Sequence, residues 1–273
     1  MSKINNAIHE IYEMDELVLK NSSIHQLHPL VKLVVTLFYI VCVVSFDKYN
    51  LFGLLPMILY PILVFNLAEL NIRKCFIKFR FVLPVICFMA IFNPMIDHTP
   101  LINISGVLIT GGMVSMITLV IKGTLALMAS FLLIASTGIE GICYALKLMG
   151  IPNIIVTQIL LAYRYITLLM QEANTVSEAY SLRAPKEKGV KYKVWGSLIG
   201  QLMFRSIDRA TSLYESMILR GFHGTYYFRA NQRLTHRDYI YLAIWVCILG
   251  VLKFYQILNI VLLFIQHHAW FSL

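Results

Sequence analysis

The residues most able to do chemistry in this chain form one pattern that occurs twice. The stretches Glu178 to Arg183 and Glu215 to Arg220 both read Glu-x-x-x-Leu-Arg, and a small residue follows each. Residues that stop a helix come next, with Pro185 after the first and Gly221 directly after the second. One arginine in a last helical turn gains roughly 0.3–1 kcal/mol from the helix dipole and needs no partner. Because the charged ending is doubled, it indicates a surface offered to a partner that has two equivalent receiving sites. The candidate contact residues are Glu178, Leu182, Arg183, Ala184, Glu215, Leu219, Arg220 and Gly221.

Other chemistry is not indicated by residue spacing. The sequence contains no G-x-x-x-x-G-K-[ST] loop for nucleotide phosphates, so we expect ATP, if it is used, to be bound by another subunit. The histidines show no metal-ligand spacing, and we expect no catalytic residue, no metal site and no cofactor in this chain. Lys122 interrupts an apolar stretch, and we expect it to face protein, to snorkel or to bind something, in a structural role or as a gating or partner contact.

The elements that must position the doubled ending belong to a membrane protein. The chain has 273 residues, 59% hydrophobic and 14% charged, with a mean hydropathy of +0.73. Soluble domains are roughly 45–50% apolar and about 25% charged. The pattern predicts an all-α integral membrane protein with about five membrane-embedded helices and a pair of long helices between the last two. The predicted spans are Leu30 to Phe46, Leu51 to Ala68, Phe81 to Ile96, Met113 to Ser136 and Tyr239 to Ile265.

Each copy of the doubled ending closes one of the two long helices. We expect a short helix near Ile139 to Met149, a long helix from Pro152 to Arg183 and another from Tyr192 to Arg220. Pro152 suits a first helical turn, and neither Gly nor Pro interrupts the 30 positions that follow it up to Leu182. The two long helices carry more apolar surface than a connector in water could expose. This pattern predicts that partners cover these helices.

The positions of the cations set the expected topology. The link between the second and third spans carries Arg73, Lys74, Lys78 and Arg80, whereas the link from Asp97 to Gly112 has neither Lys nor Arg. The positive-inside rule therefore places the N-terminus and the region of the long helices in the cytoplasm. We expect a cytoplasmic N-terminal segment over 1–28, membrane helices over 29–136, a cytoplasmic coupling region over 137–237, and the last membrane helix with an external tail over 238–273. The net charge of +9 then reflects topology and anionic lipid rather than nucleic acid.

With these motifs in view, the sequence resembles the transmembrane subunit of energy-coupling-factor importers, most closely the cobalt (CbiQ-type) branch. The stretch Leu27 to Leu33 is similar to the family's opening of the first span, where Pro29 and Lys32 stand. The stretch from Gly150 to Glu172, which includes Pro152 and Arg164, is similar to the approach to the first coupling helix. The stretches Arg205 to Ala210 and Met217 to Gly224 are similar to the second.

The resemblance implies a non-catalytic subunit in the plasma membrane, multi-pass, with a cytoplasmic N-terminus. Two cytoplasmic ABC-type ATPases, which bind ATP and Mg, would receive Arg183 and Arg220 in acidic grooves. A separate membrane subunit would bind the substrate, expected to be cobalt, with nickel or a vitamin as the alternative. Leu182 and Leu219 replace the family's Ala before each Arg, and Ala184 replaces a Gly or Ser, which puts the fit to the groove in question. Outside this family, the alternatives are an integral membrane enzyme and a partner-free channel.

Overall fold

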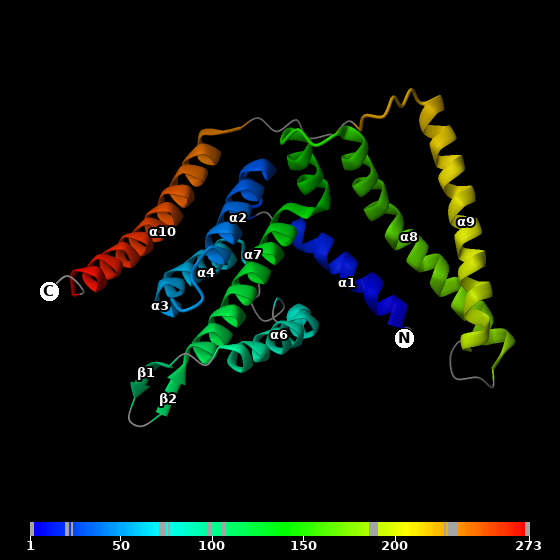
Figure 1. Ribbon diagram of the computed structural model, residues 1–273. Coiled ribbons are helices and arrows are strands. Elements are labelled where there is room, and N and C mark those ends of the chain that lie inside the picture. Colours follow the sequence, from blue (N-terminus) through cyan, green and yellow to red (C-terminus); the bar gives the residue numbers. More distant parts are fainter. Residues whose placement is uncertain are drawn as a thin grey trace. The chain divides into compact units, whose positions relative to one another are not determined.

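The computed structural model describes residues 3–19, 22, 24–70, 75, 77–97, 100–104, 107–185, 191–226, 228 and 234–270. Helices dominate these residues, as Figure 1 shows, so the predicted all-α class is confirmed. A two-stranded antiparallel hairpin, β1 (Pro100–Ile104) and β2 (Val107–Thr110), is the exception, and it occupies the link predicted to be external. Arg73 and Lys74, which helped to set the predicted topology, lie outside the described residues.

The chain packs into two compact units. The first consists of residues 1–19 and 138–231, and the second of residues 20–137 and 232–273. The first unit contains α1 (Lys3–Val18), α8 (Asn153–Arg183) and α9 (Tyr192–Leu219). The second contains α2 (Pro29–Val44), α3 (Leu51–Leu54), α4 (Leu59–Leu67), α6 (Val82–Ile96) and α10 (His236–Trp270), with short 3-10 turns at Leu55–Ile58 and Phe79–Phe81.

The helix α7 (Gly111–Leu148) runs from the second unit into the first. It is interrupted at Gly138, whose φ of 69° and ψ of 166° are not helical. Such a conformation is essentially restricted to glycine, because other residues have a Cβ that clashes with the backbone there. The sequence prediction of one span to Ser136 and a separate short helix from Ile139 is therefore confirmed by the break.

The predicted spans match helices, with one internal correction. The expected continuous helix from Leu51 to Ala68 is divided by the 3-10 turn Leu55–Ile58. Pro56 lies in this turn, and a proline cannot donate the backbone hydrogen bond that a continuous α-helix needs there. The N-terminal helix α1 was not predicted, although Ile4, Ile8 and Ile11 recur in its sequence at helical spacing among polar residues.

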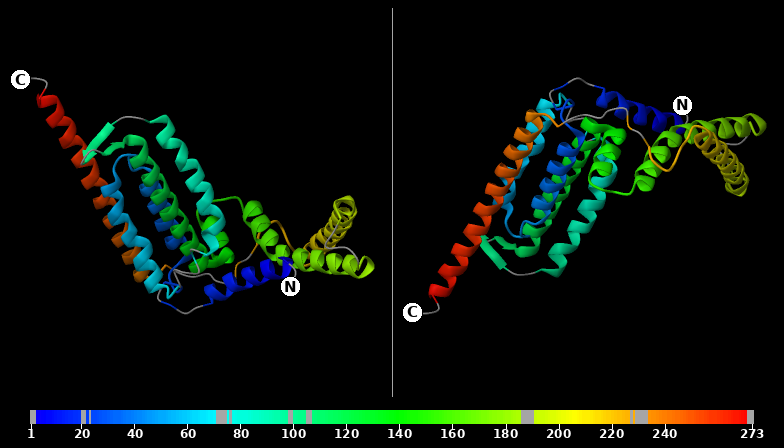
Figure 2. Two further views of the ribbon diagram at one scale, coloured as in Figure 1. Left: turned by 90° about the horizontal axis from the view of Figure 1, so that it is seen from below. Right: turned by 90° about the horizontal axis from the view of Figure 1, so that it is seen from above.

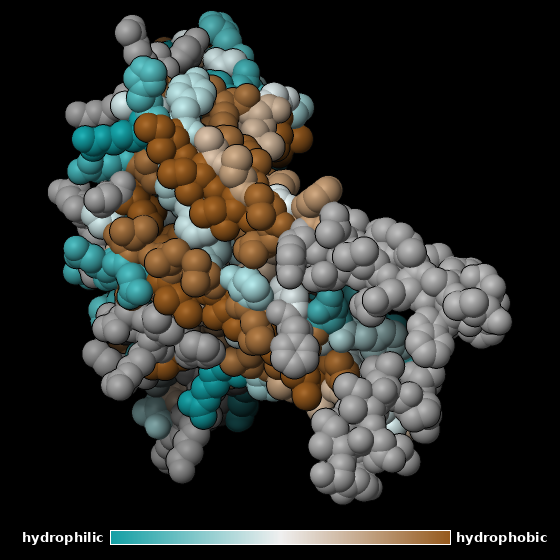
Figure 3. Space-filling model, turned by 90° about the vertical axis from the view of Figure 1, so that its left-hand side faces the viewer, coloured by the Kyte–Doolittle hydropathy of each residue, from teal (hydrophilic) through white to brown (hydrophobic). Residues whose placement is uncertain are grey.

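The second unit has a core of aromatic and aliphatic side chains. Tyr39 and Tyr60 stack with ring centroids 4.3 Å apart, and Trp245 of α10 meets Tyr60 edge-on at 4.7 Å. The Tyr39 hydroxyl donates to the Met57 carbonyl at 2.9 Å, which satisfies a buried polar group inside this core. Hydrophobic side chains also dominate the described part of one outer face (Figure 3), as expected for a surface in lipid.

Length and composition identify two described helices that could cross a membrane, α7 and α8. The apolar stretches Pro29–Val44, Leu55–Leu67 and Phe79–Met95 are shorter. The sequence places α8 in the cytoplasm, and that placement stays a prediction. Only Val156, Thr157 and Leu160 of α8 are buried within the chain, so most of its apolar surface must be covered by lipid or by another protein.

Candidate functional site

The first predicted contact surface is the end of α8. Arg183 is the last helical residue, and both it and Leu182 are exposed, Leu182 to 82%. The helix closes where the Ala184 backbone N–H donates to the Tyr180 carbonyl at 3.0 Å. Glu178 lies three residues before Ser181, in the last part of the helix. Its carboxylate accepts a 2.6 Å hydrogen bond from the Asn174 side chain. The Leu-Arg pair is therefore free of the chain's own core and faces outward.

The second predicted surface, the end of α9, is closed by a different device. Arg220 is the C-cap residue, and Gly221 follows with a φ of 80°. The Phe222 N–H donates to the Met217 carbonyl at 3.0 Å and the Gly221 N–H to the Ile218 carbonyl at 2.9 Å, which is the bond pattern of a Schellman motif. Leu219 is 88% exposed and Arg220 and Glu215 are exposed as well. Gly221 is thus needed for the backbone turn that presents Arg220.

The two endings do not come together. α9 runs back along α8 in the opposite direction, so the end of α8 lies near the start of α9 and Arg220 lies at the far end of the pair (Figure 1). Figure 2 gives the same pair from below and from above. At 1.5 Å per residue, α9 separates its two ends by about 40 Å. The arrangement offers two separate docking points rather than one composite site.

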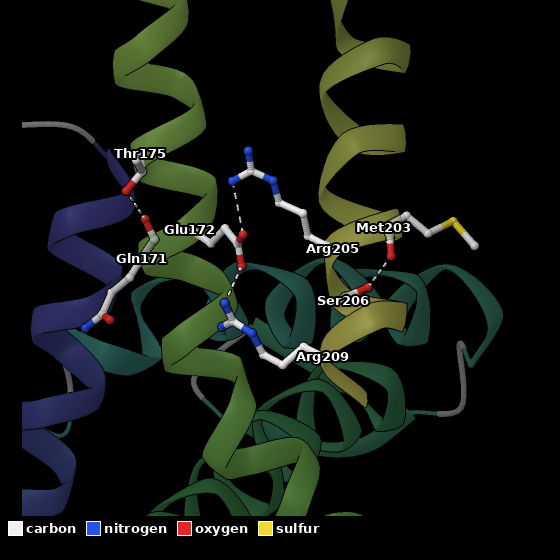
Figure 4. Close-up of polar contacts among 7 residues, drawn as sticks. All are labelled: Gln171, Glu172, Thr175, Met203, Arg205, Ser206 and Arg209. Carbon is white, nitrogen blue, oxygen red and sulfur yellow. Dashed lines mark hydrogen bonds and ion pairs between the residues drawn. The ribbon is translucent and has the colours of Figure 1, made fainter. Parts of the chain in front are cut away.

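A contact that the sequence reasoning missed joins the two helices between these points. The Glu172 carboxylate of α8 lies between two arginines of α9, as Figure 4 shows. Arg205 Nη1 is 3.3 Å from Glu172 Oε1, and Arg209 Nη2 is 3.3 Å from Oε2. The second contact is an ion pair without hydrogen-bond geometry, since Arg209 Nη2 is close to Oε2 but forms no hydrogen bond with it. The Glu172 side chain is only 12% exposed, so its charge is held away from water by this pairing.

The helix α1 packs along α8 and is fixed by polar contacts. The Tyr163 hydroxyl donates to the Asp15 carboxylate at 2.6 Å, and the Gln171 amide donates to the Tyr12 hydroxyl at 3.4 Å. Burial, together with the hydrogen bond to Asp15, raises the pKa of the Tyr163 hydroxyl above its usual range. The Tyr163 hydroxyl therefore keeps its proton and donates it to the hydrogen bond with Asp15.

A cavity of about 770 Å³ opens between the first half of α8 and the second half of α9. Its lining is mostly apolar, with polar groups from Gln158, Arg209 and His223. Among the residues that the structure describes, no group of three or more His, Cys, Asp or Glu side chains is placed to hold a metal ion. The lining residues are Ile154, Thr157, Gln158, Leu161, Ala162, Tyr165, Leu169, Ser206, Arg209, Ala210, Leu213, Tyr214, Met217, Phe222, His223 and Gly224.

Four residues belong to the stretches that resemble the family's opening of the first span and its approach to the first coupling helix: Pro29, Lys32, Pro152 and Arg164. Their surroundings differ. Pro29 is at the first position of α2, and Pro152 is the N-cap of α8. Lys32 is 5% exposed and donates to the Ser136 carbonyl at 2.8 Å. This carbonyl lies two residues before the break in α7, so Lys32 supplies a buried donor near the end of the first helical segment. Arg164 is exposed.

The two lysines inside apolar helices converge on the end of α2. Lys122 of α7 donates to the carbonyls of Val44, at 3.2 Å, and Phe46. Lys253 of α10 donates to the Ser45 carbonyl at 2.7 Å and to its hydroxyl at 2.9 Å. Three successive carbonyls at the negative end of a helix dipole are thus met by two cations. This geometry gives Lys122 a structural role in the second unit.

Comparison with known proteins gives one family and two relatives. The CbiQ family, described as cobalt transport protein, matches residues 20–230. The nickel permease LarQ of Lactiplantibacillus plantarum is 31% identical over 116 residues, which is 41% of this chain and 42% of LarQ. The uncharacterized protein MJ1571 of Methanocaldococcus jannaschii is 22% identical over 147 residues, 53% of this chain and 50% of that protein. The chain thus spans half or less of the length of each of these relatives.

Proposed function

The chain belongs to the CbiQ family of cobalt transport proteins, and from this membership we propose that it is the coupling subunit of an energy-coupling-factor importer. The family supports a membrane-embedded component of a transporter, and its description, together with the relative LarQ, favours cobalt or nickel as the substrate. In the proposed mechanism, two partner ATPases bind ATP and Mg, close, and move α8 and α9. These helices pass the motion to a membrane subunit that binds the substrate.

The observation that carries the proposal is the exposure of both charged endings at separate ends of a helix pair. Leu182 and Leu219 are 82% and 88% exposed, and an arginine follows each. A leucine so exposed beside an arginine is an unfavourable solvent surface but a suitable anchor for a groove with an acidic residue. Two such anchors suit two copies of one kind of ATPase, as the resemblance implies.

The surface of α9 supports a second partner. None of the 28 residues of α9, all of which the structure describes, is buried. Trp195, Ile199, Met203 and Phe204 are exposed to between 51% and 73%. A helix with this much open apolar surface needs a cover, and the substrate-binding membrane subunit is the proposed one.

Cobalt is the proposed substrate, and nickel is the second candidate. The family description names cobalt, whereas the relative LarQ is a nickel permease. Neither the family description nor the relative LarQ favours a vitamin. The choice between two divalent cations of similar size would belong to the substrate-binding subunit, as the resemblance implies.

The test is to isolate the tagged chain from its native membrane and identify the proteins that accompany it. We expect an ABC-type ATPase and a second membrane protein. The complex is then reconstituted in liposomes and supplied with radioactive cobalt or nickel, with and without ATP. ATP-dependent accumulation of either metal is expected. Uptake that proceeds without ATP or ATPase would instead favour a channel, and a chain that has no ATPase and converts a membrane-soluble substrate would favour an enzyme.

A further inference from the structure

The repeat that ends α8 and α9 extends further back than the Glu-x-x-x-Leu-Arg pattern. Residues 172–183 read EANTVSEAYSLR and residues 209–220 read RATSLYESMILR. Aligned without gaps, the two segments share an Ala, a Glu, a Leu and the final Arg, and Thr/Ser and Val/Leu replace each other at two more positions. The first position of the repeat is Glu172 in one copy and Arg209 in the other. These are the residues that form the ion pair between the helices.

We propose that the Glu172–Arg209 pair is the pivot of a local two-fold crossing, from which both docking ends are equally distant. This inference rests on the proposed function, because it assigns the pair the task of keeping the two ends moving together. Glu172 and Arg209 are then positioning residues for coupling, and neither needs to touch an ATPase or the metal.

The spacing supports a symmetric lever. Arg183 follows Glu172 by 11 residues, and Arg220 follows Arg209 by 11 residues. At 3.6 residues and 5.4 Å per turn, that is about three turns and about 16 Å on each arm. Because about three whole turns separate them, each terminal arginine projects from nearly the same side of its helix as its pivot residue. A rotation about the pivot therefore shifts both docking ends by similar amounts.

The charges at the pivot follow from this symmetry. Where two antiparallel copies of one segment cross on a two-fold axis, equivalent positions face each other. A repeat with the same charge at that position would place like charges in contact. Here the two copies differ in charge sign at this position, and opposite charges meet at 3.3 Å.

Arg205 makes the crossing less than perfectly symmetric. It is one turn before Arg209 and binds the other oxygen of Glu172, at 3.3 Å. Its side chain is 49% exposed, compared with 40% for Arg209 and 12% for Glu172. The carboxylate is therefore the enclosed group, and the two guanidiniums hold it from the more open side. Arg205 adds strength to the crossing, whereas the position of Arg209 in the repeat gives the crossing its symmetry.

The test uses charge reversal and charge exchange in the complete importer. Glu172→Arg or Arg209→Glu places like charges at the pivot, and we expect ATP-dependent metal uptake to fall about fivefold or more. ATP hydrolysis should persist, so that metal transported per ATP falls too. The exchange, Glu172→Arg with Arg209→Glu, is made in an Arg205→Gln background so that no second cation opposes the new arginine. We expect the exchange to return uptake to within about twofold of Arg205→Gln alone. The control Asp208→Asn changes an exposed charge next to Arg209 and should leave uptake unchanged.

A distance measurement tests the pivot apart from transport. Spin labels at Ser181 and Ile218, equivalent positions of the repeat, report the separation of the two ends in a chain without its native cysteines. In the parent protein we expect a narrow distance distribution that shifts when ATP binds. Glu172→Gln, which keeps the side-chain shape, should broaden it and abolish the shift even if the reversed-charge variants fail to fold.

Two outcomes would contradict the pivot and leave the proposed function standing. One is normal uptake and unchanged distances in Glu172→Gln and the reversed-charge variants, and the other is a charge exchange that folds but restores nothing. A parent complex that transports neither cobalt nor nickel with ATP would instead overturn the proposed function.

Discussion

At the scale of single residues, the second unit depends on cations that meet backbone carbonyls. Lys32 is buried and donates to the Ser136 carbonyl, while Lys122 and Lys253 donate to the carbonyls that end α2. Each lysine comes from a helix distant in sequence from its acceptor. In a medium without water, such an acceptor has few other donors available, so these bonds contribute to the packing of the unit.

Replacing Lys32 tests this view. Lys32→Met keeps most of the side-chain volume but removes the donor, and we expect a loss of about 1–3 kcal/mol in the free energy of unfolding, because the Ser136 carbonyl loses a buried hydrogen bond. The matched control is Lys48→Met. The Lys48 side chain is 59% exposed and pairs with Asp97 at 3.0 Å, and an exposed pair of this kind contributes little to stability. The two variants are compared by thermal denaturation in the same detergent. Equal losses in the two would contradict the role of Lys32.

At the scale of elements, the break in α7 decides where one unit ends and the other begins. Gly138 has a φ that suits glycine, and a Cβ added there would lie 3.1 Å from a methyl group of Val18. The backbone therefore strains any side chain at this position, and Val18 of α1 would also have to shift slightly to make room for it. The unit boundary, Thr137 to Gly138, falls at this same residue.

Gly138→Ala is consequently expected to destabilise the protein by about 1–3 kcal/mol, which is the usual cost of a strained backbone conformation. Gly196→Ala should act in the opposite direction. Gly196 lies within α9, and a Cβ added there would meet nothing within 4 Å. Alanine should therefore stabilise α9 by about 0.5–1 kcal/mol. The thermal midpoint measures the effect of Gly138→Ala, and protection of the α9 amides from hydrogen exchange measures the effect of Gly196→Ala. A Gly138→Ala protein of unchanged stability would show that the break can be helical.

The endings of α8 and α9 carry a prediction of their own. Arg183→Glu or Arg220→Glu turns attraction to an acidic groove into repulsion, so ATPase docking should weaken by roughly 2–5 kcal/mol, with membrane insertion intact. Lys193→Glu, at the exposed start of α9, reverses a charge away from both endings and serves as the control. The measurement is the amount of ATPase recovered with the chain, alongside metal uptake. Full recovery and full uptake in the double arginine variant would refute docking at these ends.

The sequence predicted most of these elements and few of the contacts between them. Helix periods and stop signals are local, so Pro152, Pro185 and Gly221 located the ends of α8 and α9 correctly. The division at Pro56 and the hairpin at Pro100–Thr110 were missed because apolar runs conceal a short 3-10 turn and a loop can hold strands. The pairing of Glu172 with Arg209 joins residues 37 positions apart on two helices, and no local pattern states which side chains will meet.

At the scale of the whole molecule, orientation in the membrane still rests on the distribution of cations. A cysteine at Thr99 should react with a membrane-impermeant reagent added outside the cell, and a cysteine at Lys188 only after the cytoplasmic face is exposed. Both positions lie outside the described residues, so this choice depends on the sequence. The native cysteines are replaced first, and the unlabelled parent chain is the control. The reverse labelling pattern would invert the proposed topology, and with it the side on which an ATPase could dock.

The contact between α1 and α8 also orders events during synthesis. Asp15 is made 148 residues before Tyr163, its hydrogen-bond partner. At about 5–20 residues per second, the ribosome reaches Tyr163 roughly 7–30 s after Asp15. A helix of 16 residues is marginal when alone in water, so α1 has little to stabilise it during that interval. The helix α1 is thus translated well before α8, and it can be covered by α8 only after Tyr163 has been made.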